Sequence, residues 1–192
     1  MIRRLYDRTL QLSEHPHALR WLGVVSFAES SFFPIPPDVM LIPMIVAQRA
    51  KAWLIATVCT VASVLGGLAG YALGFFAFAA VGQPVMEFYG YGEKFTEFTT
   101  EFNEYGAWIV FVFGITPFPY KVITIASGVT QLDVLTFMMA STLSRGIRFY
   151  LEAALLWYFG PPVRAFIEKR LEWVVTVAVI LLIGGFVAVS YL

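Results

Sequence analysis

The chain is poor in the residues that most catalytic and metal sites require. It has one cysteine and two histidines among 192 residues. A single cysteine, Cys59, cannot form an intrachain disulfide or a thiolate metal site. His15 and His17 lie in a polar N-terminal segment, and the acidic residues form no cluster with metal-ligand spacing. The sequence therefore predicts no catalytic residue, no metal site and no cofactor.

Charge of either sign is also scarce. The 13 basic and 13 acidic residues cancel to a formal net charge of zero. No basic stripe exists to neutralise phosphodiesters, which excludes nucleic acid as a partner. The first 18 residues are too polar for the apolar core of a signal peptide. We therefore expect the N-terminus to be retained.

Apolar residues are abundant instead. They make up 59% of the chain, aromatic residues make up 17%, and the mean hydropathy is +0.75. Soluble domains contain about 45–50% apolar residues. The composition therefore predicts an all-α integral membrane protein.

Two short apolar segments are each interrupted by a proline cluster. The apolar run from Trp21 to Phe33 is about 20 Å long as a helix, whereas a bilayer core is about 30 Å thick. Each interrupted segment is therefore predicted to be a re-entrant hairpin, over residues 20–48 and 107–131. Matching prolines are 83 positions apart, which suggests an internal duplication of the kind found in transporters. The proposed tips contain Pro34, Pro36 and Pro37 in the first hairpin and Pro117 and Pro119 in the second.

The fold class expected is an inverted repeat of these two hairpins with about three full transmembrane helices and an N-terminal amphipathic helix. The amphipathic surface helix covers residues 1–19. The membrane domain covers 20–160 and includes crossings at 52–82 and 133–160. Residues 161–192 supply the C-terminal transmembrane helix, and the polar stretch 83–105 is expected to be an interfacial helix or loop.

Six ionisable residues fall at membrane depth in this topology. A charge at the bilayer centre costs about 2.5–3.5 kcal/mol, so such residues face the bundle interior or water and are functional by default. The basic residues would hold a phosphate, and the acidic ones would exchange protons or form ion pairs. The basic set is Lys121, Arg145 and Arg148, and the acidic set is Glu29, Asp38 and Glu152.

Purely structural roles also stay open for several of these residues. Arg148 and Glu152 are four positions apart and could neutralise each other on one helix face. Glu29 could carry a proton, or it could form a permanent ion pair with Arg145 or Arg148. Asp38 follows two prolines, so the preferred interpretation is an ordinary carboxylate at a helix N-terminus.

A stripe of small residues runs through the first predicted crossing. Gly66, Gly70 and Gly74 are spaced four apart and lie on one helix face. Such a stripe lets helices approach closely. We interpret it as a packing surface against which a hairpin could lie.

These motifs together resemble the DedA family, also called the VTT or SNARE-associated family, and its small YqaA-type branch. The motifs are Phe27-Ala28-Glu29, the proline cluster ending in Asp38, the block from Gly66 to Tyr71, Thr116 to Lys121 with Gly128, and Arg145 to Arg148. The resemblance covers roughly residues 20–160. It implies opposed re-entrant hairpins, lipid translocation and dependence on the proton-motive force.

By the same resemblance, Glu29 and Asp38 match the acidic positions of the first hairpin. Members often carry arginines around the second proline motif, whereas this chain has Thr116 and Lys121 there. A lysine lacks the bidentate fork of arginine, so the lipid substrate is left open. The localisation expected is a bacterial inner membrane, multi-pass, with a cytoplasmic N-terminus according to the positive-inside rule.

The sequence leaves three functions to compare. The first is a transporter that moves an anionic lipid, undecaprenyl phosphate or a phospholipid, between leaflets with protons as a second partner. The second is a membrane-embedded enzyme, disfavoured because both histidines lie in the polar N-terminal segment and the acidic residues form no cluster with metal-ligand spacing. The third is a proton-coupled transporter of small solutes or ions supporting membrane-potential homeostasis. A slot open sideways to lipid would favour the first over the third.

Overall fold

The computed structural model describes residues 17–33, 35–82, 84, 92–116 and 118–160, and all regular structure within them is helical. This part of the chain agrees with the predicted all-α class. The predicted surface helix at 1–19 and the C-terminal crossing at 161–192 fall almost wholly outside the described residues. Pro34 and Pro117 lie outside them too.

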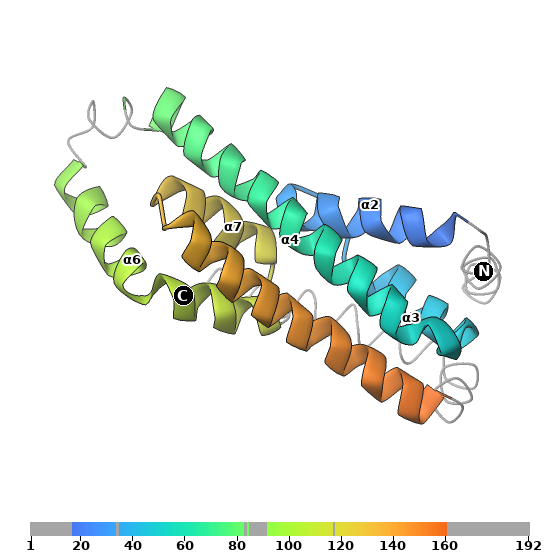
Figure 1. Ribbon diagram of the computed structural model, residues 1–192. Helices are drawn as coiled ribbons and strands as arrows, with labels where there is room; N and C mark the ends of the chain where they lie inside the picture. The colour runs from blue at the N-terminus through green and yellow to red at the C-terminus, as the bar shows by residue number, and fades with distance from the viewer. Residues whose placement is uncertain (1–16, 34, 83, 85–91, 117, 161–192) are drawn as a thin grey trace, which may run out of the picture.

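Two helical hairpins and two long helices make up the described fold. In chain order the elements are α2 (Ala18–Ser31), α3 (Asp38–Ala47), the 3-10 turn η1 (Arg49–Lys51), α4 (Ala52–Ala77), the π-helical turn η2 (Phe78–Gly82), α6 (Gly92–Ile115), α7 (Tyr120–Val129) and a helix over residues 134–160. Figure 1 shows the chain reversing between α2 and α3, and again between α6 and α7. The helix over 134–160 runs beside α4 in the opposite direction.

Proline and aspartate define where three of the helices begin. Pro37 precedes α3 and Pro119 precedes α7. Proline suits these positions because its missing N–H would have no partner in the first helical turn. Asp133 starts the next helix, since its Oδ2 accepts hydrogen bonds from the Thr136 amide at 2.7 Å and from the Thr136 hydroxyl at 2.8 Å.

The two halves of the chain have corresponding element starts. α3 begins at Asp38 and α7 at Tyr120, 82 positions later. α4 begins at Ala52, and the second long helix begins 82 positions later at residue 134. α3 and α7 each contain 10 residues.

The described residues contain one helix that is long and apolar enough to cross a membrane, Arg49–Ala80. Its position agrees with the crossing expected at 52–82. The helix over 134–160 matches the second expected crossing in extent, but it carries Arg145, Arg148 and Glu152.

The region before the second proline cluster differs from the expectation. Residues 83–105 were predicted as an interfacial helix or loop, separate from a half-helix that begins at 107. Instead α6 continues without a break from Gly92 to Ile115. Gly106 does not interrupt it, because the helix packs there against the side chain of Leu132. One helix therefore joins a polar first half to an apolar second half.

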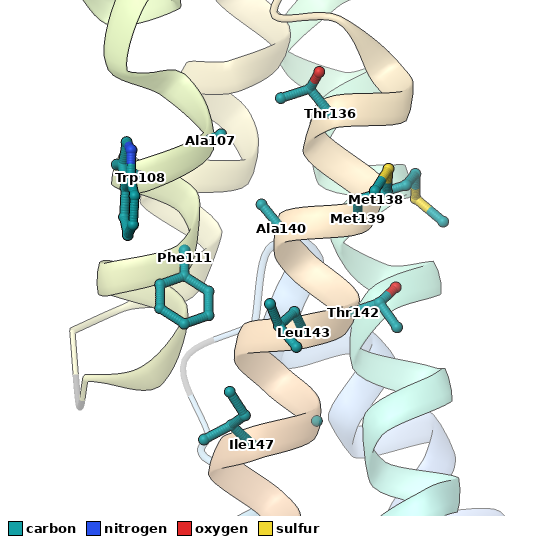
Figure 2. A pocket seen from close by; sticks show the side chains of 11 residues that line it. Ala107, Trp108, Phe111, Thr136, Met138, Met139, Ala140, Thr142, Leu143 and Ile147 are labelled. Atoms are coloured by element: carbon teal, nitrogen blue, oxygen red, sulfur yellow. The ribbon is translucent and has the colours of Figure 1, made fainter.

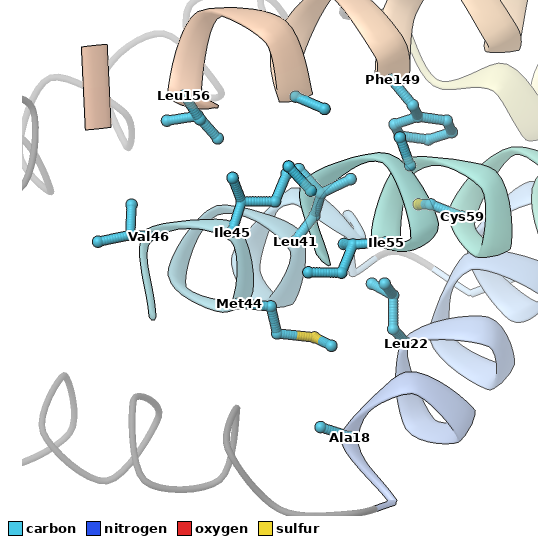
Figure 3. Close-up of a cluster of buried hydrophobic side chains, with 13 residues drawn as sticks. Ala18, Leu22, Leu41, Met44, Ile45, Val46, Ile55, Cys59, Phe149 and Leu156 are labelled. Atoms are coloured by element: carbon cyan, nitrogen blue, oxygen red, sulfur yellow. The ribbon is translucent and has the colours of Figure 1, made fainter. Parts of the chain in front are cut away.

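A cluster of buried apolar side chains joins the first hairpin to both long helices. Leu22 from α2, Leu41 and Ile45 from α3, Ile55 from α4 and Phe149 from the helix over 134–160 are each at most 1% exposed. Figure 3 shows these side chains converging from all four elements. The cluster holds the first hairpin against the helix that carries the arginines.

Candidate functional site

The two helix breaks lie next to each other in space, although they are far apart in the sequence. The Lys121 ammonium donates a hydrogen bond to the Phe33 carbonyl at 3.3 Å. The Thr124 hydroxyl donates to the Ser30 carbonyl at 3.1 Å. The start of α7 therefore rests on the end of α2. Carbonyl groups left free where α2 ends gain partners from the second hairpin.

Arg148 connects both breaks through one guanidinium. Its Nη2 donates to Asp38 Oδ2 at 2.9 Å, and its Nη1 donates to the Thr116 carbonyl at 3.1 Å. Asp38 opens α3 and Thr116 follows the end of α6. Only a fork-shaped cation can reach a carboxylate and a carbonyl in this way. A single side chain thus links three segments of the site.

Arg145, one turn earlier on the same helix, is held in a closed ring of hydrogen bonds. Its Nε donates to Ser63 Oγ at 2.7 Å and its Nη2 donates to Glu29 Oε2 at 3.3 Å. Ser63 and Ser30 share a hydroxyl hydrogen bond of 2.7 Å, and Ser30 Oγ donates to Glu29 Oε2 at 3.2 Å. The ring joins α2, α4 and the helix over 134–160.

The direction of every hydrogen bond in this ring follows from arginine chemistry. A guanidinium only donates. Ser63 Oγ therefore accepts from Arg145 and directs its own proton to Ser30, which donates in turn to Glu29. Glu29 Oε2 accepts two hydrogen bonds, one of them from a cation.

The Arg145 guanidinium also lies between two aromatic rings. Its central carbon is 4.7 Å from the Tyr120 ring centroid and 4.6 Å from that of Phe149. Cations are attracted to the faces of such rings. The residue is only 1% exposed, and its Nη1 has no hydrogen-bond partner. Arg145 is therefore enclosed by protein on all sides.

The structure corrects two of the interpretations made from sequence. Arg148 was considered as a partner of Glu152 on its own helix, but its salt bridge within the described residues goes to Asp38. Asp38 does lie in the first turn of α3, as expected. Its carboxylate, however, pairs with Arg148 instead of closing a backbone cap. Arg148 therefore pairs with a carboxylate from another helix, Asp38, and not with Glu152 four residues away on its own helix.

The three basic residues do not form an open cationic pocket in this structure. Glu29 neutralises Arg145 and Asp38 neutralises Arg148. Lys121 has no carboxylate partner among the described residues, and it is partly exposed. An incoming anion could therefore reach Lys121 first, and it could reach Arg148 only in competition with Asp38.

Residues 35–158 match the VTT domain family. The chain belongs to this family, which includes the DedA proteins. An uncharacterized protein of Haemophilus influenzae is 39% identical over 180 residues, covering 92% of this chain and 93% of the relative. An uncharacterized protein of Histophilus somni is 40% identical over 170 residues, covering 88% of each chain. No solved structure matches the chain. VTT-domain proteins are membrane proteins, and the family points to a transporter-like role.

In this VTT domain the glycine stripe of α4 lies against both hairpins. A Cβ atom on Gly66 would lie 2.2 Å from the Phe27 carbonyl of α2. On Gly74 it would lie 2.1 Å from the Ile125 carbonyl of α7, and on Gly70 2.4 Å from the Thr124 hydroxyl. The missing side chains allow helix backbones to touch. The stripe therefore positions Ser30 and Thr124, which link the two breaks.

An open apolar groove of about 950 Å³ lies on the VTT domain between α6 and the helix over 134–160. Figure 2 shows Ala140, Leu143 and Ile147 projecting between these helices, opposite Phe111 of α6. Gly146 and Ile147, at one end of the groove, lie between Arg145 and Arg148 in the chain. The groove and the charged site therefore occupy neighbouring faces of one helix.

Several site residues of this VTT domain were not identified from sequence. Ser30 and Ser63 complete the Arg145 ring, and Tyr120 covers its guanidinium. A serine in an apolar helix is too common to single out. The spacing of Ser63, Gly66, Gly67 and Gly70 could have indicated the face of α4 that receives Arg145, because small residues every third or fourth position lie together.

Proposed function

We propose that this VTT-domain protein transfers an anionic lipid between the leaflets of a bacterial inner membrane. In this proposal α2–α3 and α6–α7 are re-entrant hairpins that enter from opposite sides. The length of their returning helices supports this, because 10 residues span about 15 Å of a bilayer core about 30 Å thick. The equal offset between the two halves of the chain is consistent with a repeat of this kind.

The observation that carries the proposal is the apolar groove beside the charged site. A lipid needs an apolar surface for its chain and a polar path for its headgroup. The groove opens along the helix that bears Arg145 and Arg148. A small-solute transporter would instead need a closed aqueous vestibule. The open apolar groove therefore favours a lipid over the alternative of a solute or ion.

Headgroup contact would begin at Lys121. This side chain lies where the two breaks meet, and it is the basic residue of the site without a carboxylate partner among the described residues. A phosphate could then displace Asp38 from Arg148, exchanging one charge-assisted hydrogen bond for another. Because Arg148 also holds Thr116, that exchange would loosen the link between the hairpins and let the headgroup pass.

Reconstituted flipping tests this function. Purified protein in proteoliposomes should move fluorescent undecaprenyl phosphate or an anionic phospholipid across the bilayer faster than protein-free vesicles do, and return it chemically unchanged. A zwitterionic phospholipid serves as the comparison, and each lipid is measured with and without a pH gradient. Equal rates with and without protein for every lipid tested would overturn the proposal.

A further inference from the structure

A row of exposed aromatic and hydroxyl side chains joins α4 to the helix over 134–160 near one end of the molecule. The Trp53 ring stacks on the Tyr150 ring, with centroids 6.1 Å apart, and its centroid lies 6.3 Å from that of Trp157. One turn further along α4, the Thr57 and Tyr150 hydroxyls share a hydrogen bond of 2.6 Å. All four side chains are exposed. The row is therefore open to whatever surrounds the helices.

Two basic residues precede this row, in the turn η1. Arg49 Nη2 donates to the Trp157 carbonyl near the C-terminal end of its helix, where a cation is favourable. Gly160 leaves room for this contact, because a Cβ atom there would lie 3.0 Å from Arg49 Nε. Lys51 is exposed, and its ammonium has no hydrogen-bond or ion-pair partner within the described residues. Arg49 is thus fixed by the helix end, whereas Lys51 is available to a ligand.

The basic turn and the aromatic row form one surface, the aromatic seam. It consists of Arg49, Lys51, Trp53, Thr57, Tyr150 and Trp157. The seam begins at the first residue of the helix that is long and apolar enough to cross a membrane, Arg49–Ala80. Along α4 the cations come first, then an indole ring, then a hydroxyl group one turn deeper. Tryptophan and tyrosine are enriched at the membrane–water interface, because their rings are apolar with a polar edge. The order of side chains in the seam therefore fits the edge of a bilayer.

Charge distinguishes the two ends of the described fold. Figure 1 shows the start of α4 and the end of the helix over 134–160 at one end, and the start of α6 at the other. The seam contains two basic residues and no acidic residue, whereas the first half of α6 contains four exposed glutamates, Glu93, Glu97, Glu101 and Glu104, against one lysine. The positive-inside rule assigns the seam to the cytoplasmic side. Anionic lipids of that leaflet attract basic residues near the membrane surface.

We propose that the aromatic seam binds the headgroup of an anionic phospholipid in the cytoplasmic leaflet. The Lys51 ammonium holds the lipid phosphate as a flexible point charge. The rings of Trp53 and Trp157 cover the glycerol region, and the acyl chains continue into the bilayer. The rings favour a lipid over free phosphate, because they place apolar surface beside the cation. This site holds a resident lipid at the membrane surface and is separate from the helix breaks and the groove, which the proposed function assigns to the transported lipid.

Native mass spectrometry of the purified full chain in detergent tests this site. Phosphatidylglycerol and phosphatidylcholine with identical acyl chains are titrated, and the apparent affinity for the first bound lipid is measured. The anionic phosphatidylglycerol should bind more tightly than the zwitterionic phosphatidylcholine. Lys51→Gln should weaken phosphatidylglycerol binding about fivefold, the effect of one basic side chain at an anionic surface. Lys51→Arg keeps the charge and should retain the affinity.

Three further variants locate the lipid. Trp53→Leu should weaken the binding of both lipids, because the ring contacts the glycerol region that they share. Phe98→Leu is the matched aromatic control, since Phe98 is exposed on α6 at the opposite end. Lys121→Gln is the charge control at the helix breaks, and both controls should bind phosphatidylglycerol as wild type does. Glycerol phosphate, which carries the anion without acyl chains, should not compete. Size-exclusion chromatography checks that each variant remains folded.

Four results would overturn the proposal. The first is equal affinity of the wild-type chain for the two lipids, and the second is wild-type affinity in Lys51→Gln, which would place the anion elsewhere. The third is competition by glycerol phosphate, which would make this a site for soluble phosphates. The fourth is a dimer that Trp53→Leu dissociates, which would make the seam a contact between two copies of the chain. Lipid transfer in vesicles tests the proposed function separately, so either proposal can fail while the other stands.

Discussion

Arg148 and Asp38, 110 positions apart in the chain, form a salt bridge of 2.9 Å that joins the first helix break to the helix over residues 134–160. The same guanidinium binds the carbonyl of Thr116 at the second break. Loss of this one side chain should therefore remove a polar link between the long helix and both hairpins at once. The contact is partly exposed, at 20% for Arg148 and 22% for Asp38, so an anion can compete for it.

Replacing Arg148 tests this bridge. Arg148→Ala should abolish lipid transfer while the protein still inserts into membranes, because insertion depends on the apolar helices. Arg148→Lys should keep the charge but leave transfer at about a tenth or less of wild type, since an ammonium cannot hold Asp38 and the Thr116 carbonyl in the same fork geometry. Flipping rates at matched protein density in vesicles measure both. Wild-type rates in Arg148→Ala would show that the bridge has no role.

Glu29→Gln tests the buried pair with Arg145. The substitution leaves a guanidinium that is 1% exposed without its counter-ion, and breaking such a pair costs about 3–5 kcal/mol. We expect loss of function, a lower midpoint of thermal unfolding and retained membrane insertion. The double variant Glu29→Gln/Arg145→Met should recover stability but not function, because it removes both charges. A Glu29→Gln variant as stable and active as wild type would contradict the ring assignment.

Gly66→Ala tests the close approach of α4 and α2. The added Cβ would lie 2.2 Å from the Phe27 carbonyl, which is backbone and cannot rotate away. We expect a loss of stability of about 1–3 kcal/mol, the usual cost of overpacking. Gly23→Ala is the matched control on α2, because its nearest neighbour would be a side-chain atom at 3.6 Å. Thermal unfolding in detergent should separate the two variants. Equal midpoints would mean that the helices can move apart freely.

Leu143→Trp tests the groove. Leu143 is 57% exposed and lines the groove, so a larger ring there should occupy part of its volume with little effect on folding. We expect lipid transfer to slow several-fold, more for long-chain lipids than for short-chain analogues. Leu135→Trp on the same helix is the control, since Leu135 is 67% exposed and does not line the groove. Equal rates in both variants would place the lipid chain elsewhere.

The sequence was sufficient to locate the helix breaks and the long apolar helix α4. Pro36, Pro37 and Pro119 act through local backbone chemistry, so their effect is visible without any tertiary contact. The continuity of α6 could not be predicted from local composition. Its composition changes from acidic to apolar near Gly106, and a composition change looks like a boundary even where the helix continues.

The pairing of the charges could not be predicted. Arg148 and Glu152 have suitable spacing for a pair on one helix, yet the salt bridge is to Asp38. Glu29 had two equivalent candidates, and the fold places it against Arg145. Ser30 and Ser63 are 33 positions apart, and their role depends on how α2 packs on α4. These contacts arise from helix packing, which the glycines of α4 permit but do not specify.

The sequence by itself determined that this is a membrane protein of helices, where its short helices begin, and which six ionisable side chains lie among apolar neighbours. These properties follow from local hydrophobicity and from proline geometry. Only the tertiary structure decided which acid neutralises which arginine, and that both breaks meet at Arg148. The physical reason is that ion pairs depend on distances of a few ångströms across helices, and those distances exist only after the helices have packed.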